Sequence, residues 1–387
     1  MSWVQLDSSV PGATWDVAGF VPREVLRCAG VGKGAELSRG AKVVRKWGDE
    51  LEAIAWLEED ARERRWTGCF GYDLGRAFER LPVRAANDLE MPAFVFGRGE
   101  GGVREEEQAG RAGGIGIRST FRREEYLEAA RRTVEYIRAG DVFQVNLSQR
   151  FTAELAEEPW EIYQRMRERT PARYGGFLDF GDHVLMCNSP ELFLKVIPLP
   201  DGMRRILTRP IKGTRPRGEG MREELFLSEK DRAELNMIVD LERNDLGRVC
   251  EVGSVRVSEP RGIEEHPTVY HGVATIEGRL REEVGLVDLL RATFPGGSIT
   301  GAPKIRAMEI IEELEPTRRG AYCGAIGWIG PGGQMELNVA IRTMTAKGGL
   351  VHMPVGGGIV ADSMPEDEYE ETLVKARAMF EAVGVKI

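Results

Sequence analysis

The sequence predicts an α+β fold in which most strands pair antiparallel. Residues 143–151 alternate between apolar and polar side chains, as a strand with two different faces does. Residues 126–137 carry apolar side chains at helical spacing, and Gly140 follows them as a stop signal. Beyond residue 322, strand-like runs are separated by the turns GPGG and KGG, which is typical of a β-meander.

The composition excludes several classes of protein. A chain of 387 residues usually forms two or three domains, although a mixed-sheet fold of this length can be one body. The net charge of −9 does not favour nucleic acid or an anionic membrane as a partner, so a small anionic substrate would need a local cluster of cations. Five scattered cysteines without a CxxC pair argue against a disulfide framework and a zinc site. No apolar run could cross a membrane, and the N-terminus lacks a signal-peptide pattern, so we expect a cytoplasmic protein.

The N-terminal region, residues 1–114, carries few informative patterns. We expect a surface helix within residues 56–66. The region ends in a glycine- and glutamate-rich stretch, residues 97–114, that we expect to be an exposed loop. Residues 115–387 contain the patterns with a chemical interpretation, and we expect both parts to pack in one body.

Residues 210–217, PIKGTRPR, are the most informative stretch. Arg215 and Arg217 suit carboxylates, Gly213 lets backbone N–H groups approach a ligand, and a desolvated Lys212 can act as a nucleophile. An exposed basic loop is the plainer interpretation of such a string. The motifs elsewhere in the chain decide between the two.

The alternating strand places a row of polar side chains on one face. They either line a polar cavity or face water on a half-buried strand. The polar face holds Gln144, Asn146, Ser148 and Arg150, and the apolar face holds Phe143, Val145, Leu147 and Phe151.

Two charged residues stand beside or within apolar strands. Glu191 lies at the turn of a predicted strand–turn–strand unit over residues 183–196, where a carboxylate usually faces water. Arg342 lies within the predicted strand 336–346, where an unpaired charge is costly. A structural salt bridge is the simpler explanation for Arg342, and a contact with the carboxylate of a bound ligand is the more specific one.

Two predicted helices begin with carboxylates beside their apolar faces. Such carboxylates are usually caps or salt bridges, but two acidic helix starts can also share a divalent cation. The first helix has Ser228 as its candidate N-cap, followed by Asp231 and Glu234, and the second has Ser363 as its candidate N-cap, followed by Glu366, Glu368, Glu371 and Lys375.

Two glycine-rich runs offer backbone groups to a ligand. Residues 295–304, PGGSITGAPK, lead directly into a predicted helix and present backbone N–H groups at its positive end, which suits an anion. Gly356–Gly358 end the predicted meander, where only backbone can approach a ligand.

Seven motifs resemble, in the same order, those of the chorismate-utilising enzymes, which include anthranilate synthase component I, aminodeoxychorismate synthase component I and the isochorismate synthases. The resemblance runs from about residue 121 to residue 379 without large gaps. The motifs are AGDVFQVNLSQRF, NSPELFL, PIKGTRPR, SEKDRAELNMIVDLERNDLGR, PGGSITGAPKIRAMEIIEELEPTRRGAYCGAIGW, ELNVAIRT and GGGIVADSMPEDEYEETLVKARA.

The resemblance implies two large antiparallel sheets packed face to face with helices on the outside. It makes residues 115–387 the chorismate-binding core, with chorismate as substrate and Mg²⁺ as cofactor. It implies catalytic roles for Lys212, Glu191 and His271, with Glu191 as general acid or base.

The resemblance also implies a metal site and a substrate site. Mg²⁺, bound to the ring carboxylate of chorismate, is assigned to Glu234 and Glu371, with Asp231 and Glu368 as nearby or water-mediated partners. Arg342 and Tyr322 are expected to hold the enolpyruvyl carboxylate. The full set of implied substrate contacts is Gly213, Thr214, Ser298, Thr300, Tyr322, Arg342, Gly356, Gly358 and Lys375.

Two positions indicate which family member this chain resembles. Isochorismate-forming members, which add water, have a sequence similar to KVVLAR at the alternating strand, with a lysine as base. This chain has Gln144 there, which indicates ammonia and not water as the nucleophile. Anthranilate synthases resemble PIAGT, whereas aminodeoxychorismate synthases resemble PIKGT, as this chain does at Lys212; GGSITGAPK favours the same member. The expected function is therefore amination of chorismate at C4 in 4-aminobenzoate and folate biosynthesis, and anthranilate synthase component I is the alternative.

The expected mechanism is covalent. If Lys212 attacks C2 while the C4 hydroxyl leaves, ammonia can enter only at C4 and then expels the lysine. Lys212 must be neutral to attack, so we expect burial, Arg215 and Arg217 to lower its pKa. A purely electrostatic role for Lys212 is the alternative.

The source of ammonia is expected to be a second protein. No cysteine stands in a glutaminase nucleophile context, so a separate glutamine amidotransferase subunit, or free ammonia, must supply the nitrogen. TPARY, residues 170–174, stands where many members have NPSPY, which argues against bound tryptophan. A non-catalytic scaffold for a glutaminase is the alternative from another class.

Overall fold

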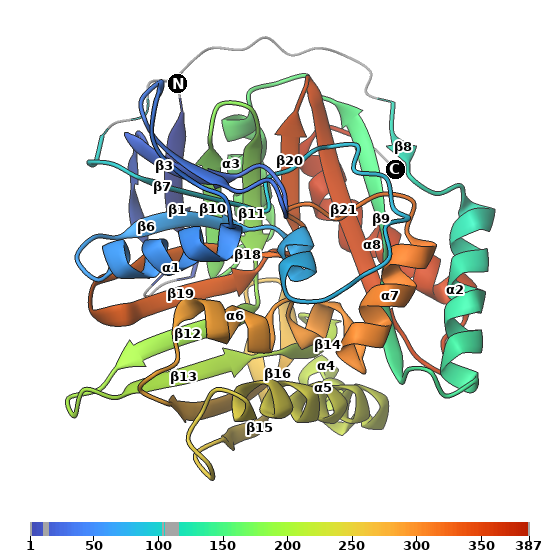
Figure 1. Cartoon of the computed structure of the whole chain (residues 1–387). Helices are drawn as coiled ribbons and strands as arrows, with labels where there is room; N and C mark the ends of the chain where they lie inside the picture. Colours follow the sequence, from blue (N-terminus) through green and yellow to red (C-terminus); the bar gives the residue numbers. More distant parts are fainter. Residues whose placement is uncertain (1, 11–14, 103, 105–115, 386–387) are drawn as a thin grey trace.

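Two large antiparallel sheets form the body of the molecule, and helices surround them (Figure 1). The computed structural model describes residues 2–10, 15–102, 104 and 116–385. This architecture confirms the predicted fold class.

The nine-stranded sheet combines segments from both ends of the sequence. The predicted alternating strand is β9, which lies between β17 and β21. In spatial order the sheet contains β17 (Gly301–Ala302), β9 (Gln144–Glu154), β21 (Leu350–Ile359), β20 (Thr343–Lys347), β11 (Val184–Ser189), β10 (Tyr174–Asp179), β1 (Trp3–Asp7) and β2 (Val17–Phe20), with β8 (Arg118–Ser119) paired to β9.

The twelve-stranded sheet carries the PIKGTRPR stretch at one edge. In spatial order it contains β14 (Ile211–Pro216), β16 (Val269–Leu280), β13 (Arg204–Arg209), β12 (Leu192–Pro198), β19 (Gln334–Val339), β18 (Ala325–Gly330), β6 (Trp66–Phe70), β7 (Phe94–Arg98), β3 (Glu24–Cys28), β4 (Ala35–Arg39) and β5 (Lys42–Trp47), with β15 (Arg256–Glu265) paired to β16.

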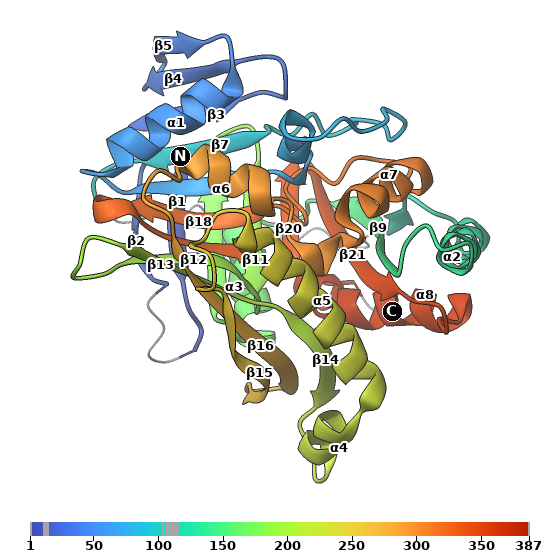
Figure 2. The same ribbon diagram turned by 60° about the horizontal axis from the view of Figure 1, so that its bottom comes forward.

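Helices cover the outer faces of both sheets (Figures 1 and 2). The nine-stranded sheet is covered by α2 (Arg123–Arg138), α3 (Pro159–Arg169) and α8 (Pro365–Ala382). The twelve-stranded sheet is covered by α1 (Glu50–Ala61), α5 (Glu229–Gly247) and α6 (Leu286–Thr293), while α4 (Met221–Leu227) lies beside β14 and α7 (Lys304–Leu314) beside β9. No helix in the described part of the chain is long and apolar enough to cross a membrane.

An apolar core joins the inner faces of the two sheets. Leu178 and Leu185 of the nine-stranded sheet pack in one cluster with Cys69, Val95 and Ile326 of the twelve-stranded sheet. The N-terminal region contributes β1 and β2 to one sheet and β3 to β7 to the other. All five cysteines are buried free thiols.

Two of the places where the chain crosses between the sheets are adjacent. Pro190 and Glu191 link β11 to β12, and residues 340–342 link β19 to β20. The Val339 N–H donates to the Glu191 carbonyl oxygen at 3.0 Å, and the Asn188 N–H donates to the Arg342 carbonyl oxygen at 3.1 Å. The single strand predicted over residues 336–346 and the continuous meander were therefore wrong, because each is divided between two sheets. The predicted strand–turn–strand unit over residues 183–196 is confirmed as β11, a turn and β12, although the two strands join different sheets.

Local predictions near the N-terminal region also need correction. The predicted surface helix is α1, which ends at Ala61 and buries Ile54 and Leu57. Gly97 is a buried residue of β7 rather than part of a loop. Most of the remaining stretch to residue 114 lies outside the described residues.

The helix starts agree with prediction in one case only. The Ser228 hydroxyl accepts a hydrogen bond from the Asp231 N–H at 3.3 Å, as an N-cap does. Ser363 is not the N-cap of α8, because the helix starts at Pro365 and Met364 occupies that position. The Ser363 hydroxyl instead donates to the Glu368 carboxylate at 2.5 Å.

Candidate active site

Glu191 lies at the first crossing, between the two sheets, and only 4% of it is exposed. The expectation that this turn carboxylate faces water was wrong, because the turn joins two sheets instead of two hairpin strands. The Ser298 hydroxyl donates to Glu191 Oε1 at 2.5 Å. Burial raises the pKa of Glu191 to about 7, although the Ser298 hydrogen bond and the Lys212 charge act in the opposite direction. Both protonation states are therefore accessible near neutral pH.

Lys212 reaches the same place from the edge strand β14. Its Nζ donates to the Ser298 carbonyl oxygen at 3.5 Å. Burial lowers the pKa of Lys212, against the opposing charges of Glu234 and Glu191. The plainer interpretation of residues 210–217 as an exposed loop was wrong, since residues 211–216 form a strand and Lys212 is partly buried.

The arginines beside Lys212 are paired with carboxylates of the protein. Arg215 contacts Glu224 at 2.7 Å and Asp231 at 3.1 Å, and Arg217 contacts Glu265 at 2.7 Å. Burial lowers the pKa of Lys212 as predicted, and the Lys375 charge adds to this effect. The prediction that these arginines contribute was wrong, because neither is among the causes of the shift. Gly213 has φ +82°, and a Cβ there would lie 2.8 Å from Asp231 Cγ.

His271 lies on β16 opposite Thr214 of β14. Its Nδ1 lies 2.9 Å from the Thr214 hydroxyl oxygen. Burial lowers the pKa of His271 to about 3, and the Arg342 charge adds to this effect. The imidazole is therefore neutral at physiological pH, which suits a hydrogen-bonding role better than a cationic one.

Gln144 is fully buried, and neither its amide nitrogen nor its amide oxygen has a hydrogen-bond partner among the described residues. A Cβ on Gly358 of β21 would lie 2.1 Å from Gln144 Nε2 and 3.5 Å from Lys212 Nζ. Gln144, Lys212 and Gly358 therefore meet at one point. An unpaired buried amide is costly, so this point suits a polar ligand.

The rest of the predicted polar row has other partners. Ser148 donates to Glu315 at 2.7 Å, and Arg150 pairs with Asp88. The whole row is buried, so the alternative of a water-facing strand was wrong. Phe143 was also misplaced, because it precedes β9 and 70% of it is exposed.

Arg342 lies at the second crossing with φ +47°, an uncommon conformation for a residue with a side chain. In the part of the chain that the structure describes, its guanidinium has no carboxylate partner and no hydrogen bond. The salt-bridge explanation therefore finds no support. Burial lowers its pKa, so an anionic ligand would satisfy a desolvated cation.

Gly356–Gly358 lie within β21, which continues to Ile359. The Gly356 carbonyl oxygen accepts a hydrogen bond from Lys375 Nζ at 3.0 Å, and the same nitrogen contacts Glu371 at 2.6 Å. Tyr322 is buried in the turn before β18. Lys375, one of the predicted substrate contacts, therefore connects its own helix, α8, to the strand β21.

The predicted metal ligands lie near the N-termini of α5 and α8. Burial raises the pKa of Glu234, and the Glu371 charge contributes; burial and the Glu371 charge also raise the pKa of Glu368. Burial would also raise the pKa of Glu371, but Lys375, Lys230 and Lys212 outweigh it, so that pKa is lowered. The carboxylates of the two helices therefore lie within each other's electrostatic field.

These carboxylates could hold Mg²⁺ only with help from other ligands. Among the residues that the structure describes, no three acidic, histidine or cysteine side chains form a group that could bind a metal ion. Asp231 is also engaged by Arg215. Since Mg²⁺ usually takes one or two carboxylates and keeps waters and substrate oxygens, the donor set fits that ion.

The glycine-rich run, residues 295–304, ends at the first residue of α7, so it leads directly into a helix as predicted. Ser298 lies in the 3₁₀ turn η2 (Gly297–Ile299), and β17 separates this turn from α7. Thr300 is fully buried, and its hydroxyl donates to the Gly296 carbonyl oxygen at 2.8 Å. The run therefore presents the Ser298 hydroxyl to Glu191, and an anion cradle at the start of α7 stays a prediction.

Sequence reasoning missed one buried ion pair next to this site, Arg319 with Glu315. Two opposite charges four residues apart, at the end of a predicted helix, were its only signal. In the structure, Arg319 of this pair donates hydrogen bonds to the carbonyl oxygens of Ile299 and Asn146.

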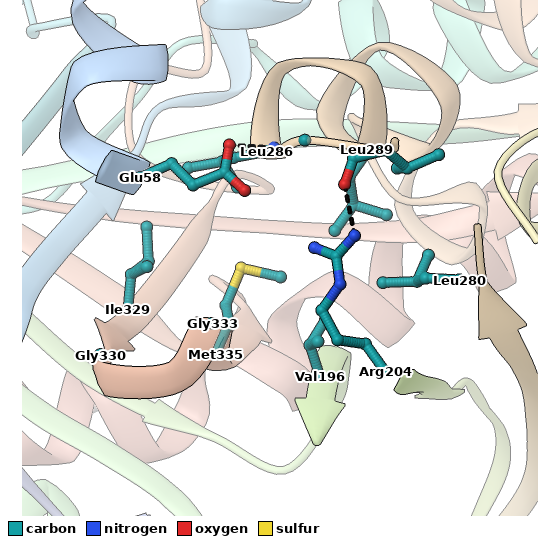
Figure 3. A pocket seen from close by; sticks show the side chains of 12 residues that line it. Glu58, Val196, Arg204, Leu280, Leu286, Leu289, Ile329, Gly330, Gly333 and Met335 are labelled. Atoms are coloured by element: carbon teal, nitrogen blue, oxygen red, sulfur yellow. Dashed lines mark hydrogen bonds between the residues drawn. The ribbon is translucent and has the colours of Figure 1, made fainter. Parts of the chain in front are cut away.

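Two pockets lie elsewhere and contain no predicted site residue. One, of about 30 Å³, lies beside α6; Figure 3 shows apolar side chains such as Leu280 and Met335 around it, with Arg204 and Glu58. The other is a groove of about 760 Å³ near residues 73–93. The candidate site is instead the junction where Glu191, Lys212, Ser298, Gln144 and Gly358 meet.

The sequence pattern of the chorismate binding enzymes matches residues 102–381. The chain belongs to this family. Anthranilate synthase component 1 of Thermus thermophilus is 43% identical to this chorismate-binding enzyme over an alignment of 358 residues, and the match covers 82% of this chain and 76% of the relative. Aminodeoxychorismate synthase component 1 of Klebsiella aerogenes is 44% identical over an alignment of 341 residues, and that match covers 80% of this chain and 74% of the relative.

A solved structure resembles this chorismate-binding enzyme over nearly its whole length. The crystal structure of anthranilate synthase component I from Streptococcus pneumoniae has a TM-score of 0.81 and 29% identity, and the match covers 96% of this chain and 93% of that chain. Relatives whose names refer to two different reactions are therefore similar to this chain at nearly the same sequence identity.

Proposed function

We propose that this chorismate-binding enzyme is aminodeoxychorismate synthase component I, which aminates chorismate at C4 with ammonia. One observation carries the proposal. The partly buried amine of Lys212 and the buried carboxyl of Glu191 lie on two sides of Ser298, which contacts both. A neutral amine and a protonated carboxyl are the nucleophile and the acid that the reaction needs.

In the first step, the Lys212 Nζ lone pair forms a bond to C2 of chorismate. The two ring double bonds move by one position toward C4, and the C4–oxygen bond breaks. Glu191 gives its proton to the departing hydroxyl, which leaves as water, and the adduct nitrogen carries a positive charge. This step divides one difficult displacement into two easier ones.

In the second step, ammonia forms a bond to C4 and the double bonds return. The C2–nitrogen bond breaks, and Lys212 leaves as a neutral amine. The new ammonium group at C4 then returns a proton to the Glu191 carboxylate. The sum is chorismate plus ammonia giving 4-amino-4-deoxychorismate plus water, which a second enzyme converts to 4-aminobenzoate.

Cations near the site would hold the two carboxylates of the substrate. The guanidinium of Arg342, with Tyr322 and the backbone at Gly356, is proposed to bind the enolpyruvyl carboxylate. Glu234 and Glu371 are proposed to hold Mg²⁺, with Asp231 and Glu368 nearby, and the ion would supply positive charge to the ring carboxylate. The neutral imidazole of His271 would contribute a hydrogen bond at the ring.

A separate glutamine amidotransferase subunit is proposed to supply ammonia. The relatives of both kinds are named component 1, which implies a second component for those proteins. Anthranilate synthase component I is the second candidate function, because a relative of that name is as similar as one named aminodeoxychorismate synthase.

One incubation separates the candidates. The purified chain is mixed with chorismate, Mg²⁺ and an ammonium salt at alkaline pH. A product that an added aminodeoxychorismate lyase converts to 4-aminobenzoate supports the proposal. Anthranilate fluorescence without the lyase would instead assign the second candidate, and no consumption of chorismate would indicate a non-catalytic subunit. Repeating the incubation with EDTA tests the requirement for Mg²⁺.

A further inference from the structure

A buried ion pair lies behind the candidate site. Glu315 follows the last residue of α7, and Arg319 lies in the turn four residues later. Only 2% of the Arg319 side chain and 5% of the Glu315 side chain are exposed. Arg319 Nη2 donates to Glu315 Oε1 at 2.6 Å, and Arg319 Nε donates to Oε2 at 3.0 Å. This is a two-point contact of fixed direction.

The remaining hydrogen bonds of the pair go to two segments of the candidate site. Arg319 Nη1 donates to the Ile299 carbonyl oxygen at 2.9 Å, and Nη2 donates to the Asn146 carbonyl oxygen at 2.6 Å. Glu315 Oε1 accepts from the backbone N–H and the hydroxyl of Ser148 at 2.9 and 2.7 Å. The guanidinium carbon also lies 4.7 Å from the centre of the Tyr72 ring.

The two segments carry the groups that the proposed reaction uses. Ile299 directly follows Ser298, whose hydroxyl donates to Glu191 and whose carbonyl oxygen accepts from Lys212. Asn146 pairs with Gly358 across the strands β9 and β21 and lies two residues after Gln144. The pair therefore joins the 3₁₀ turn η2 to β9 at the point where these groups meet.

We infer that Arg319, held by Glu315, is a positioning residue that fixes the η2 turn so that Ser298 stays hydrogen-bonded to Glu191. The inference rests on the proposed function, in which Glu191 is the acid. The geometry favours arginine over another residue because a planar fork can hold a carboxylate and two carbonyl oxygens at the same time. Buried ion pairs are often replaceable by apolar residues without loss of stability, so stability alone does not explain this pair.

The variant Arg319→Lys tests the inference, because it removes the planar guanidinium group but keeps the positive charge. A lysine can reach Glu315 but cannot also hold both carbonyl oxygens in fixed directions. We expect kcat for chorismate consumption to fall about 10- to 100-fold, with KM for chorismate within about threefold of wild type. Loss of the Ser298 hydrogen bond removes a contribution that lowers the Glu191 pKa. The falling alkaline limb of the pH profile should therefore move upward by about half to one pH unit.

Ser298→Ala tests whether the effect passes through Ser298. It should reproduce both the kcat loss and the shift of the alkaline limb. The double variant should be no worse than the poorer single variant, because both changes remove the same hydrogen bond. Additive losses, or an unchanged pH profile in Arg319→Lys, would show that the ion pair is only structural.

Arg76→Lys is the matched control. Arg76 also pairs with a buried glutamate, Glu312, and donates to a backbone carbonyl oxygen, that of Pro82. It contacts no segment of the candidate site, so its pH profile should equal that of wild type. An equal shift in both arginine variants would overturn the inference.

Two further measurements keep the inference testable. If Arg319→Lys does not fold, Ser148→Ala weakens the same unit by removing one hydrogen bond to Glu315 and should move the alkaline limb less, in the same direction. If wild type consumes no chorismate, the proposed function fails on its own. The Glu191 carboxyl can then be titrated by infrared difference spectroscopy against Glu191→Gln, and an identical titration in wild type, Arg319→Lys and Ser298→Ala overturns the inference.

Discussion

Lys212 combines an edge-strand position with a covered ammonium group. A lysine on an edge strand usually extends into water and prevents unwanted strand pairing. Here the nitrogen instead turns toward the Ser298 carbonyl oxygen, 3.5 Å away, and burial lowers its pKa. At the residue scale, burial therefore favours the neutral form of this amine, which is the form that the proposed nucleophile needs.

Lys212→Ala should slow formation of the 4-amino product by about 100-fold or more and direct part of the remaining turnover to C2. The reason is positional, since the lysine blocks C2 and its removal opens that carbon to ammonia. Lys212→Arg is the control, because it keeps a charge beside the substrate but provides no nucleophile. Chromatography of the products decides the point, and an unchanged rate with only the 4-amino product would exclude a covalent role. Mass spectrometry of wild type with chorismate and no ammonia should find an adduct on Lys212.

Glu191→Gln should lower kcat by about 10²- to 10⁴-fold, as loss of a general acid does. The acid must be protonated, and burial raises the Glu191 pKa to about 7. At a constant concentration of free ammonia, wild-type kcat/KM should therefore fall as pH rises through about 7, and this limb should be absent from the variant. Glu242→Gln is the control, because burial raises the pKa of Glu242 to about 8. If the fall above pH 7 disappears in Glu242→Gln and remains in Glu191→Gln, the titrating group is Glu242.

At the scale of elements, the register of β9 and β21 leaves no room for a side chain at position 358. Gly358 faces Asn146 across the pair, and its missing Cβ makes space for the Gln144 amide. A residue with a side chain at position 358 would displace that amide. The glycine is therefore needed for close approach and not for backbone conformation, because its φ is not positive.

Gly358→Ala should destabilise the fold by about 1–3 kcal/mol through overpacking, since the new Cβ would lie 2.1 Å from Gln144 Nε2. Adding Gln144→Ala should recover most of the loss, because the clash is with that side chain. Gly357→Ala is the control, where the nearest atom would lie 3.3 Å away. Chemical denaturation measures all four proteins, and a double variant no more stable than Gly358→Ala would refute the packing argument.

The N-terminal turns of α5 and α8 bring carboxylates from distant parts of the chain together. Glu371→Ala should lose more activity than the roughly 10- to 100-fold that removal of an outer partner of a metal costs, and should leave the fold intact. Glu370→Ala changes the neighbouring exposed carboxylate of the same helix and should behave as wild type. Turnover is measured against Mg²⁺ concentration, with circular dichroism for the fold. Normal turnover by Glu371→Ala without added metal would rule out the proposed ligand.

At the scale of the whole molecule, the two adjacent crossings at residues 190–191 and 340–342 determine where the site lies. One crossing carries Glu191 and the other carries Arg342, and backbone hydrogen bonds hold the crossings side by side. The apolar core packs the two sheets against each other around this arrangement. An acid and an unpaired cation are thereby presented from the interior, where an electrostatic contact is stronger than in water.

Glutamine should not serve as nitrogen donor for the isolated chain, whereas ammonium salts should. The reason is that no cysteine lies at a surface where it could act as a nucleophile, since all five thiols are buried. The assay compares the two donors with free ammonia removed by an enzymatic scavenger. A glutamine-dependent rate equal to the ammonia-dependent rate would contradict the proposal of a separate glutaminase.

The sequence by itself predicted a strand over residues 143–151, a helix over residues 126–137 and the Ser228 cap, because these depend on periodicity and local hydrogen bonds, and the structure has β9, α2 and the start of α5 there. The resemblance to the chorismate-utilising enzymes supplied the arrangement in two sheets. Only the tertiary structure decided that Glu191 is buried, that Arg215 is paired with Asp231 and that Arg319 supports Ser298. The physical reason is that alternation reports which side of a strand is apolar but not which sheet the strand joins. Residues 340–342 pass from one sheet to the other, and no glycine or proline in the sequence marks this change. A polar strand face that is buried also has the same sequence pattern as one that faces water.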